Sequence, residues 1–313
     1  MSNKTSKENV INLLNSTREE VRSWLDTFDA VLTDCDGVLW HDDIVIPGSP
    51  EVINKFISFG KLVYFVTNNG TKTRYQIWER AKRMGFNIKE ENIISPTHTI
   101  AEYLSNLNFQ QTAYVIGSKA ITDELDAKGI KHFGVGPDVI SGRLIDYIQS
   151  ELIDNKIHDV GAVIVGWDEH FSYGKMMKAS TYLGTNNDCL FLTTNVDPVK
   201  RFPMYHIPDT GSIVSSIESC VDRAVMQMGK PNPLICEGLI NAGVLKTERT
   251  LMIGDCCKID VTFGKNCGFQ TLLVGTGSYQ LEKLHNIYPN IEDYRKYIPD
   301  TYLPALGDLL TFL

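Results

Sequence analysis

The chain lacks any apolar run long enough to cross a membrane. A transmembrane helix needs about 20 consecutive, mainly apolar residues, and no stretch of the 313-residue sequence has this character. The N-terminus is polar, and the apolar segment at residues 10–14 is too short for the core of a secretory signal peptide. We therefore expect no membrane partner and a cytoplasmic location.

The sequence also has no excess of basic residues. It contains 30 Lys and Arg against 38 Asp and Glu, and its formal net charge is -8. Nucleic-acid-binding surfaces are built from clustered positive charge, so the composition argues against a nucleic-acid partner. A site for an anionic substrate would have to be built from local hydrogen-bond donors and individual cations.

Cysteine is too sparse for a disulfide framework. The seven cysteines are an odd number and show no spacing typical of a metal site. Cys256 and Cys257 are adjacent in the sequence, so they cannot form an unstrained bridge with each other. Reduced thiols in the cytosol are the expected state.

What is present is an alternation of strand and helix signals, which predicts an α/β fold with a parallel sheet covered by helices on both faces. In the outer parts of the chain, apolar runs predict strands at 30–33, 62–66, 250–253 and 271–274. A middle section has strand signals of its own at 113–116, 162–165 and 190–192. We interpret residues 108–225 as a second α/β domain inserted into a first, discontinuous domain of residues 1–107 and 226–313.

The segment Asp34-Cys35-Asp36-Gly37 follows the first of these strands directly. Two carboxylates one residue apart can divide the work of catalysis, because one can attack an electrophile while the other moves a proton. Asp-Gly after an apolar run is also an ordinary turn signal, so this segment alone leaves both interpretations open.

Further polar residues follow other strands. Thr67-Asn68-Asn69-Gly70 comes after the strand at 62–66, and Gly254-Asp255 ends the strand at 250–253. Lys230 lies between a glycine and Pro231, and Asp260 opens the next predicted helix. A turn, a surface charge and a helix cap are the alternatives for Asn68-Asn69-Gly70, Lys230 and Asp260, respectively.

The carboxyl ends of parallel strands share one edge of the sheet, where ligands bind in open α/β folds. That edge would gather four carboxylates, which repel one another unless a cation is present. Oxygen ligands favour a hard divalent ion, and we expect Mg²⁺. Lysine, hydroxyl and amide donors at the same edge would bind a phosphoryl group, whose transfer depends on positioning and charge stabilisation.

In this order the motifs resemble those of the haloacid dehalogenase (HAD) superfamily. The likeness is greatest to its branch of phosphoglycolate, pyridoxal phosphate and 4-nitrophenyl phosphate phosphatases. Three segments of the middle section resemble the C2-type cap of that branch: Val165–Tyr173, Thr194–Asp197 and Thr210–Ser212. The resemblance implies a Rossmann-like parallel-sheet core with an inserted α/β cap domain.

The resemblance also implies roles for single residues. Asp34 would be the nucleophile that forms an aspartyl-phosphate, and Asp36 would protonate the leaving alcohol and later activate water. Mg²⁺ would be held by Asp34, by the main-chain carbonyl of Asp36 and by Asp255, with Asp260 supporting the outer shell. The phosphoryl group would be bound by Thr67, Asn68, Asn69 and Lys230, and Lys230 would also tether the nucleophile.

The implied substrate is a small-molecule phosphate ester such as phosphoglycolate or 4-nitrophenyl phosphate, with pyridoxal phosphate as the alternative. The loop at 197–211 would recognise the leaving group, and within it we single out Arg201 and His206; a solvent-exposed loop charge is the other interpretation of Arg201. The family likeness further suggests a homodimer formed through the cap.

Two departures from the family pattern leave alternatives open. Cys256-Cys257-Lys258-Ile259 places a lysine beside the expected metal ligands, where relatives usually carry an acid, and Asp209 stands where they usually have glycine. A cation close to the metal would disfavour its binding unless Lys258 points into solvent. A diverged binding or regulatory protein with low turnover is therefore one alternative, and a phosphotransferase is the other.

Overall fold

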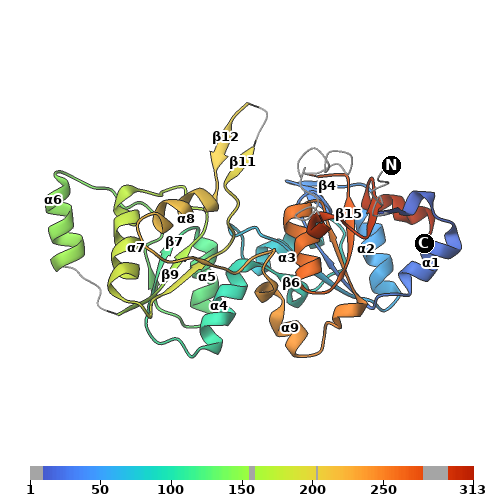
Figure 1. Ribbon diagram of the computed structural model, residues 1–313, viewed down its shortest axis with the longest axis horizontal. Helices are drawn as coiled ribbons and strands as arrows, with labels where there is room; N and C mark the ends of the chain where they lie inside the picture. The colour runs from blue at the N-terminus through green and yellow to red at the C-terminus, as the bar shows by residue number, and fades with distance from the viewer. Residues whose placement is uncertain (1–9, 155–158, 202–203, 278–294) are drawn as a thin grey trace, which may run out of the picture. The chain divides into compact units, whose positions relative to one another are not determined.

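The computed structural model describes residues 10–154, 159–201, 204–277 and 295–313. The chain forms two compact units (Figure 1). The first unit comprises residues 1–67, 78–94 and 230–313, and the second comprises residues 68–77 and 95–229. Helix α4, which the boundary predicted at residue 108 assigns to the first domain, lies in the second unit.

The first unit is built on a seven-stranded parallel sheet with the strand order β1-β16-β15-β14-β2-β5-β6. Its strands are β1 (Ile11–Asn12), β2 (Ala30–Thr33), β5 (Leu62–Val66), β6 (Ile93–Ile94), β14 (Thr250–Gly254), β15 (Gln270–Val274) and β16 (Thr301–Leu303). Every residue of β2 and β14 is buried, which is why these strands appear in the sequence as continuous apolar runs.

The helices of the first unit begin where the sequence supplies caps. Thr17 and Glu20 form a capping box at the start of α1 (Arg18–Leu25), and Pro50 occupies the first turn of α2 (Ser49–Ser58). Helix α2 packs on β5, and α10 (Thr262–Asn266) packs on β14 and β15. The remaining helical segments are η1 (Leu13–Asn15), η2 (Glu90–Asn92), η4 (Pro233–Ile235), α9 (Glu237–Asn241), η5 (Thr247–Arg249), η6 (Cys257–Val261), η8 (Arg295–Tyr297) and η9 (Leu306–Thr311). Helix α3 (Arg74–Arg83) begins in the second unit and continues into the first from residue 78.

A short hairpin follows β2 that the sequence pattern does not predict. Strands β3 (Trp40–His41) and β4 (Ile44–Val45) pair antiparallel. Asp42, in the turn between them, has a positive φ of 46°. Two-residue strands give no recognisable periodicity, so this hairpin becomes visible only in the structure.

The second unit has its own five-stranded parallel sheet, ordered β13-β10-β9-β7-β8. These strands are β7 (Thr112–Ile116), β8 (His132–Phe133), β9 (Val160–Val165), β10 (Leu190–Thr193) and β13 (Met226–Gln227). Its helices are α4 (Pro96–Asn106), α5 (Lys119–Ala127), α6 (Leu144–Tyr147), η3 (Ile148–Asp154), α7 (Tyr173–Thr185) and α8 (Thr210–Glu218). The antiparallel hairpin of β11 (Val199–Arg201) and β12 (His206–Pro208) extends from this unit (Figure 1).

The predicted α/β architecture with parallel sheets is confirmed. Each strand predicted from an apolar run is present to within two residues at either end. Within the described ranges no helix is long and apolar enough to span a bilayer. Asp209, the departure at the start of α8, has a structural role: its carboxylate accepts a hydrogen bond from the backbone N–H of Thr210 at 2.6 Å and so caps the helix.

A buried ion pair organises the second unit. Lys175 in the first turn of α7 donates to Asp168 Oδ2 at 2.5 Å, and both side chains are almost fully buried. Asp168 Oδ1 also accepts the backbone N–H of His170 at 2.8 Å. The pair therefore ties α7 to the loop that leaves the carboxyl end of β9.

We predict that Lys175→Met lowers the free energy of unfolding by about 3–5 kcal/mol, because it leaves the Asp168 carboxylate buried without its cation. Urea unfolding of the variant would measure this loss. The double variant Lys175→Met/Asp168→Leu should regain part of it. Lys119→Met is the control, since Lys119 pairs with Asp123 at the exposed surface of α5 and its loss should hardly matter. A Lys175→Met protein as stable as the wild type would contradict the prediction.

Candidate active site

The carboxyl ends of three adjacent strands place the central residues of the site. In the paired strands β14, β2 and β5, Thr33 lies opposite both Ile253 and Phe65. Asp34 and Thr67 therefore leave β2 and β5 at one edge of the sheet, together with Asp255 after β14. The backbone N–H of Asp34 extends the pairing by donating to Ile253 O at 2.8 Å.

Lys230 connects two of the carboxylates at this edge. Its Nζ donates to Asp34 Oδ1 and to Asp260 Oδ1, each at 2.7 Å, and the side chain is only 1% exposed. Asp260 is fixed from a second direction, because its Oδ2 accepts the backbone N–H of Cys256 at 3.0 Å. Hydrogen bonds of this kind to charged groups are short and strong, and they hold the side chains in one arrangement.

Burial and charge act against each other in this group. Burial lowers the pKa of Lys230, but the carboxylates of Asp260 and Asp34 outweigh it and raise that pKa above its usual value. Burial raises the pKa of Asp260, opposed by Lys230 and reinforced by the carboxylates of Asp34 and Asp255. One ammonium group thus faces three carboxylates, and the local charge balance is negative.

Glycines leave room for these carboxylates. A Cβ atom on Gly277 would lie 2.0 Å from Asp255 Oδ2, and one on Gly37, where φ is +89°, would lie 2.7 Å from the same atom. A Cβ on Gly254 would lie 2.1 Å from the Cβ of Asp260. The backbone thus approaches Asp255 and Asp260 so closely that only glycine fits.

The residues present fit a hard divalent cation. One carboxylate oxygen from each of Asp34, Asp255 and Asp260 lies within 4.8 Å of the other two. Oxygen donors with a net negative charge are the ligand set of Mg²⁺ and Ca²⁺. Asp260 differs from Asp34 in that both of its oxygens accept hydrogen bonds, one from Lys230 and one from the Cys256 N–H.

The second carboxylate of the opening motif has a different environment. Asp36 is exposed, whereas Asp34 is half-buried. Trp40 Nε1 donates to Asp36 Oδ1 at 3.1 Å. The side chains of the two aspartates therefore differ in both burial and hydrogen-bond partner, as a division of labour between them requires. The sequence did not suggest Trp40 as a site residue.

The remaining predicted residues are distributed over both units. Thr67 is 3% exposed in the first unit, and its N–H donates to Ile94 O at 3.1 Å. Asn68 and Asn69 belong to the second unit, where Asn69 Oδ1 accepts bonds from Thr71. In the second unit Arg201 lies opposite His206 in the β11–β12 ladder, and the His206 side chain is exposed.

The divergent segment between Asp255 and Asp260 leaves the carboxylates in place. Lys258 is exposed at the surface, which is the condition under which its charge disturbs a metal site least. Cys256 and Cys257 are buried, and burial with the nearby carboxylates of Asp260 and Asp255 raises the pKa of the Cys257 thiol to about 12. All seven cysteines are free, and these two are not activated nucleophiles.

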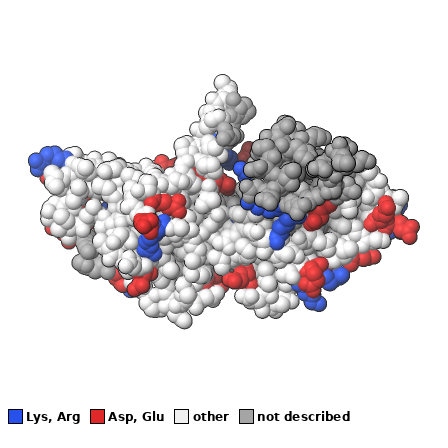
Figure 2. Space-filling view, viewed as in Figure 1, with Lys and Arg blue, Asp and Glu red and all other residues white. Residues whose placement is uncertain are grey.

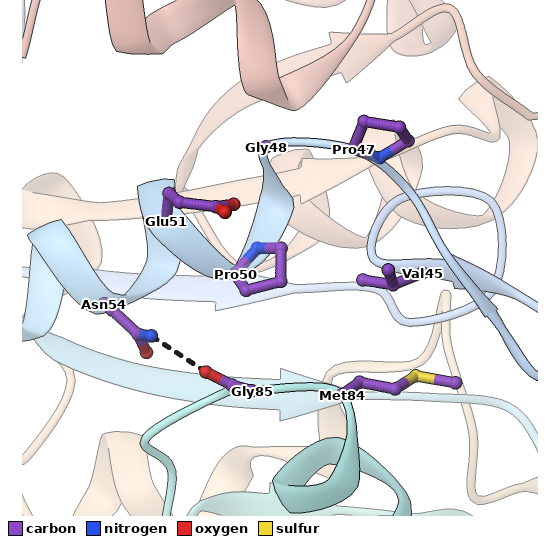
Figure 3. A pocket seen from close by; sticks show the side chains of 8 residues that line it. All are labelled: Val45, Pro47, Gly48, Pro50, Glu51, Asn54, Met84 and Gly85. Carbon is purple, nitrogen blue, oxygen red and sulfur yellow. Dashed lines mark hydrogen bonds between the residues drawn. The ribbon is translucent and has the colours of Figure 1, made fainter.

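A separate pocket in the first unit lies away from the carboxylates. Its volume is about 430 Å³, and it is lined by the start of α2 and by Met84 and Gly85 (Figure 3). Asn54 spans it by donating to Gly85 O at 2.9 Å. None of its lining residues carries the chemistry described above.

On the face drawn in Figure 2, the charged side chains of the described residues form small groups of both signs.

A parallel sheet whose carboxyl edge gathers aspartates around a buried lysine defines a hydrolase of the phosphoryl-transfer type. Two family models match the chain: haloacid dehalogenase-like hydrolase over residues 31–131, and HAD-hydrolase-like over residues 227–309. The chain belongs to the haloacid dehalogenase-like hydrolases and, among them, to the branch of phosphate-monoester phosphatases.

Named relatives span nearly the whole chain. It is 35% identical to glycerol-3-phosphate phosphatase of Gallus gallus over 94% of this chain and 95% of that protein. It is 32% identical to chloroplastic phosphoglycolate phosphatase 1A of Arabidopsis thaliana, over 94% of this chain and 79% of that protein. Its fold matches that of glycerol phosphate phosphatase from Mycobacterium tuberculosis, solved with magnesium, at a TM-score of 0.71. That match covers 91% of this chain and 78% of the other, at 19% sequence identity.

We predict that Gly277→Ala raises the Mg²⁺ concentration for half-maximal phosphatase activity by about tenfold or more, because the new methyl group displaces Asp255. The rise in Tm on adding Mg²⁺ should shrink in parallel. Gly238→Ala is the matched control, since a Cβ there meets no atom within 4 Å. An unchanged Mg²⁺ dependence in Gly277→Ala would count against Asp255 as a ligand.

Proposed function

We propose that this protein hydrolyses small phosphate monoesters in an Mg²⁺-dependent reaction that passes through an aspartyl-phosphate on Asp34. The observation that carries the proposal is the pair of 2.7 Å hydrogen bonds from the buried Lys230 to Asp34 and Asp260. This pairing holds one oxygen of Asp34 at the carboxyl edge of the sheet, in the fixed position that an attacking group needs.

In the first half-reaction a carboxylate oxygen of Asp34 attacks the phosphorus of the bound ester. The bond from phosphorus to the ester oxygen breaks, and that oxygen takes a proton from the Asp36 carboxylic acid. The products are the free alcohol, the acyl phosphate of Asp34 and the Asp36 carboxylate. Lys230, close to the attacking group, offsets the negative charge that the phosphoryl oxygens bring.

In the second half-reaction Asp36 takes a proton from water as the water oxygen attacks the same phosphorus. The acyl phosphate bond breaks, which restores the Asp34 carboxylate and releases inorganic phosphate. Asp36 is exposed, so it can reach both the alcohol and the water. The first half-reaction leaves Asp36 as the carboxylate that the second half-reaction needs as its base. The second half-reaction then restores the carboxylic acid for the next ester.

Mg²⁺ would be held by the carboxylates of Asp34 and Asp255 and by the main-chain carbonyl of Asp36, with Asp260 supporting the site. When bound, the ion supplies charge neutralisation, which lets a phosphate dianion approach a cluster of carboxylates. The oxygen-rich donor set supports this assignment. The magnesium in the related mycobacterial phosphatase supports it too.

For the substrate we propose a short aliphatic phosphate such as glycerol 3-phosphate or phosphoglycolate, on which the named relatives act. Thr67, Asn68 and Asn69 would bind the phosphoryl oxygens. The hairpin β11–β12, with Arg201 and His206, would contact the rest of the molecule. Pyridoxal phosphate stays the alternative substrate, and a homodimer formed through the second unit stays a prediction.

We predict that Asp34→Asn lowers phosphate release from 4-nitrophenyl phosphate, glycerol 3-phosphate and phosphoglycolate by roughly 10³-fold or more, because the amide is not a nucleophile. Asp29→Asn is the matched control: it makes the same chemical change at an exposed aspartate that pairs with Arg249, and it should retain full activity. Equal rates in wild type and Asp34→Asn would overturn the nucleophile assignment, and absence of turnover in the wild type would overturn the proposed function.

A further inference from the structure

The hydrogen bond between Trp40 and Asp36 joins a buried side chain to an exposed one. Trp40 is 1% exposed, whereas Asp36 is exposed. An exposed aspartate rotates freely between rotamers unless a partner restrains it. The 3.1 Å bond from Trp40 Nε1 to Asp36 Oδ1 supplies this restraint from a fixed point.

The backbone fixes Trp40 relative to Asp36. Gly37 N donates to Trp40 O at 2.8 Å, and Trp40 N donates to Cys35 O at 3.2 Å. Asp36 and Trp40 are also bridged directly through their backbones. The chain therefore folds back within four residues, so that the indole reaches the carboxylate.

Packing fixes the indole ring itself. Its centroid lies 6.1 Å from that of Phe65 and 5.9 Å from that of Phe86, both in edge-to-face geometry. The guanidinium of Arg80 lies 5.4 Å from the ring centroid. Arg80 also donates to the backbone O of Asp42, in the turn between β3 and β4. The ring is thus held by α3, β5 and the hairpin that Trp40 begins.

The direction of the hydrogen bond has a chemical consequence. An indole N–H is only a donor, so Asp36 Oδ1 must be the acceptor in both protonation states of the carboxyl group. Because the carbonyl oxygen of a carboxylic acid is a better acceptor than its hydroxyl oxygen, this bond favours the acid form with its proton on Oδ2. The bond thus selects which oxygen performs the proton transfer, as well as where the carboxyl group lies.

We propose that Trp40 is a positioning residue that fixes the Asp36 carboxyl group for proton transfer to the leaving alcohol. The inference rests on the proposed role of Asp36 in phosphate-ester hydrolysis. Trp40 itself takes no part in bond making. In the step concerned, the ester oxygen receives the Oδ2 proton of Asp36 as its bond to phosphorus breaks.

Leaving groups of different basicity separate this role from a structural one. Glycerol leaves as an alkoxide unless it is protonated, whereas 4-nitrophenolate is a stable anion that needs no acid. The ratio kcat/KM covers the steps up to departure of the leaving group. We predict that Trp40→Phe lowers kcat/KM about tenfold or more for glycerol 3-phosphate, but less than about threefold for 4-nitrophenyl phosphate.

Two controls accompany this variant. Trp78→Phe removes an equivalent N–H, which donates to Ile88 O at 2.9 Å, and it should affect both substrates equally and slightly. Replacing Trp40 by benzothienylalanine removes the donor hydrogen while keeping the bicyclic shape, and it should reproduce the Trp40→Phe pattern. This second variant covers the case in which the smaller phenyl ring destabilises the aromatic cluster.

A double-mutant cycle completes the test. Residues that act as a unit are non-additive, so Trp40→Phe should cost nothing further in an Asp36→Asn background. Equal losses on both substrates, a full additional loss in Asp36→Asn, or a benzothienylalanine protein with wild-type ratios would each overturn the positioning role. A wild-type protein that hydrolyses neither ester would instead contradict the proposed function itself.

Discussion

The ion pairs of Lys230 are the interaction on which the rest of the site depends. Lys230 bonds to Asp34, which follows β2 and lies 196 positions earlier in the sequence. It also bonds to Asp260 in η6, which lies 30 positions later. A buried lysine is tolerated only because two carboxylates surround it. The same pairing fixes the orientation of Asp34 and keeps Asp260 in place beside Asp255. Without Lys230, three carboxylates would face one another across a few ångströms.

Much of this arrangement follows from the sequence because a parallel sheet is a strong constraint. Buried strands such as Ala30–Thr33 and Leu62–Val66 are continuous apolar runs, and in a parallel sheet their carboxyl ends meet at one edge. The convergence of Asp34, Thr67 and Asp255 could therefore be predicted without coordinates. The same reasoning predicted that the cluster is negatively charged, and therefore that it needs a cation.

Other features could not be predicted, for physical reasons. Lysine is normally exposed. The family resemblance implies that Lys230 tethers the nucleophile, but nothing in the segment around Lys230 identifies Asp260 as its second partner. The β3–β4 hairpin consists of two-residue strands, too short to show any periodicity, so the bond from Trp40 to Asp36 had no sequence signal. The sequence places Lys258 between Asp255 and Asp260, where its charge would disfavour a bound cation, and only the structure shows that Lys258 is exposed.

We propose that substrate selectivity resides in the second unit, because the carboxylates and Lys230 of the first unit act on the phosphoryl group alone. In the proposed reaction the carboxylate cluster and Lys230 act on the phosphoryl group, which every phosphate ester shares. We propose that discrimination between a glycerol, a glycolate and a pyridoxal leaving group comes from the β11–β12 hairpin of the second unit, on which Arg201 lies opposite His206.

The central claim is that Asp34 becomes covalently phosphorylated. Rapid acid quenching of the enzyme during turnover, followed by mass spectrometry of its peptides, would test it directly. We predict a phosphoryl group on the Asp34 peptide that hydroxylamine removes, and its accumulation in Asp36→Asn, where water is no longer activated. Steady turnover with no phosphoryl group on Asp34 at any quench time, in either protein, would show that Asp34 is not the nucleophile.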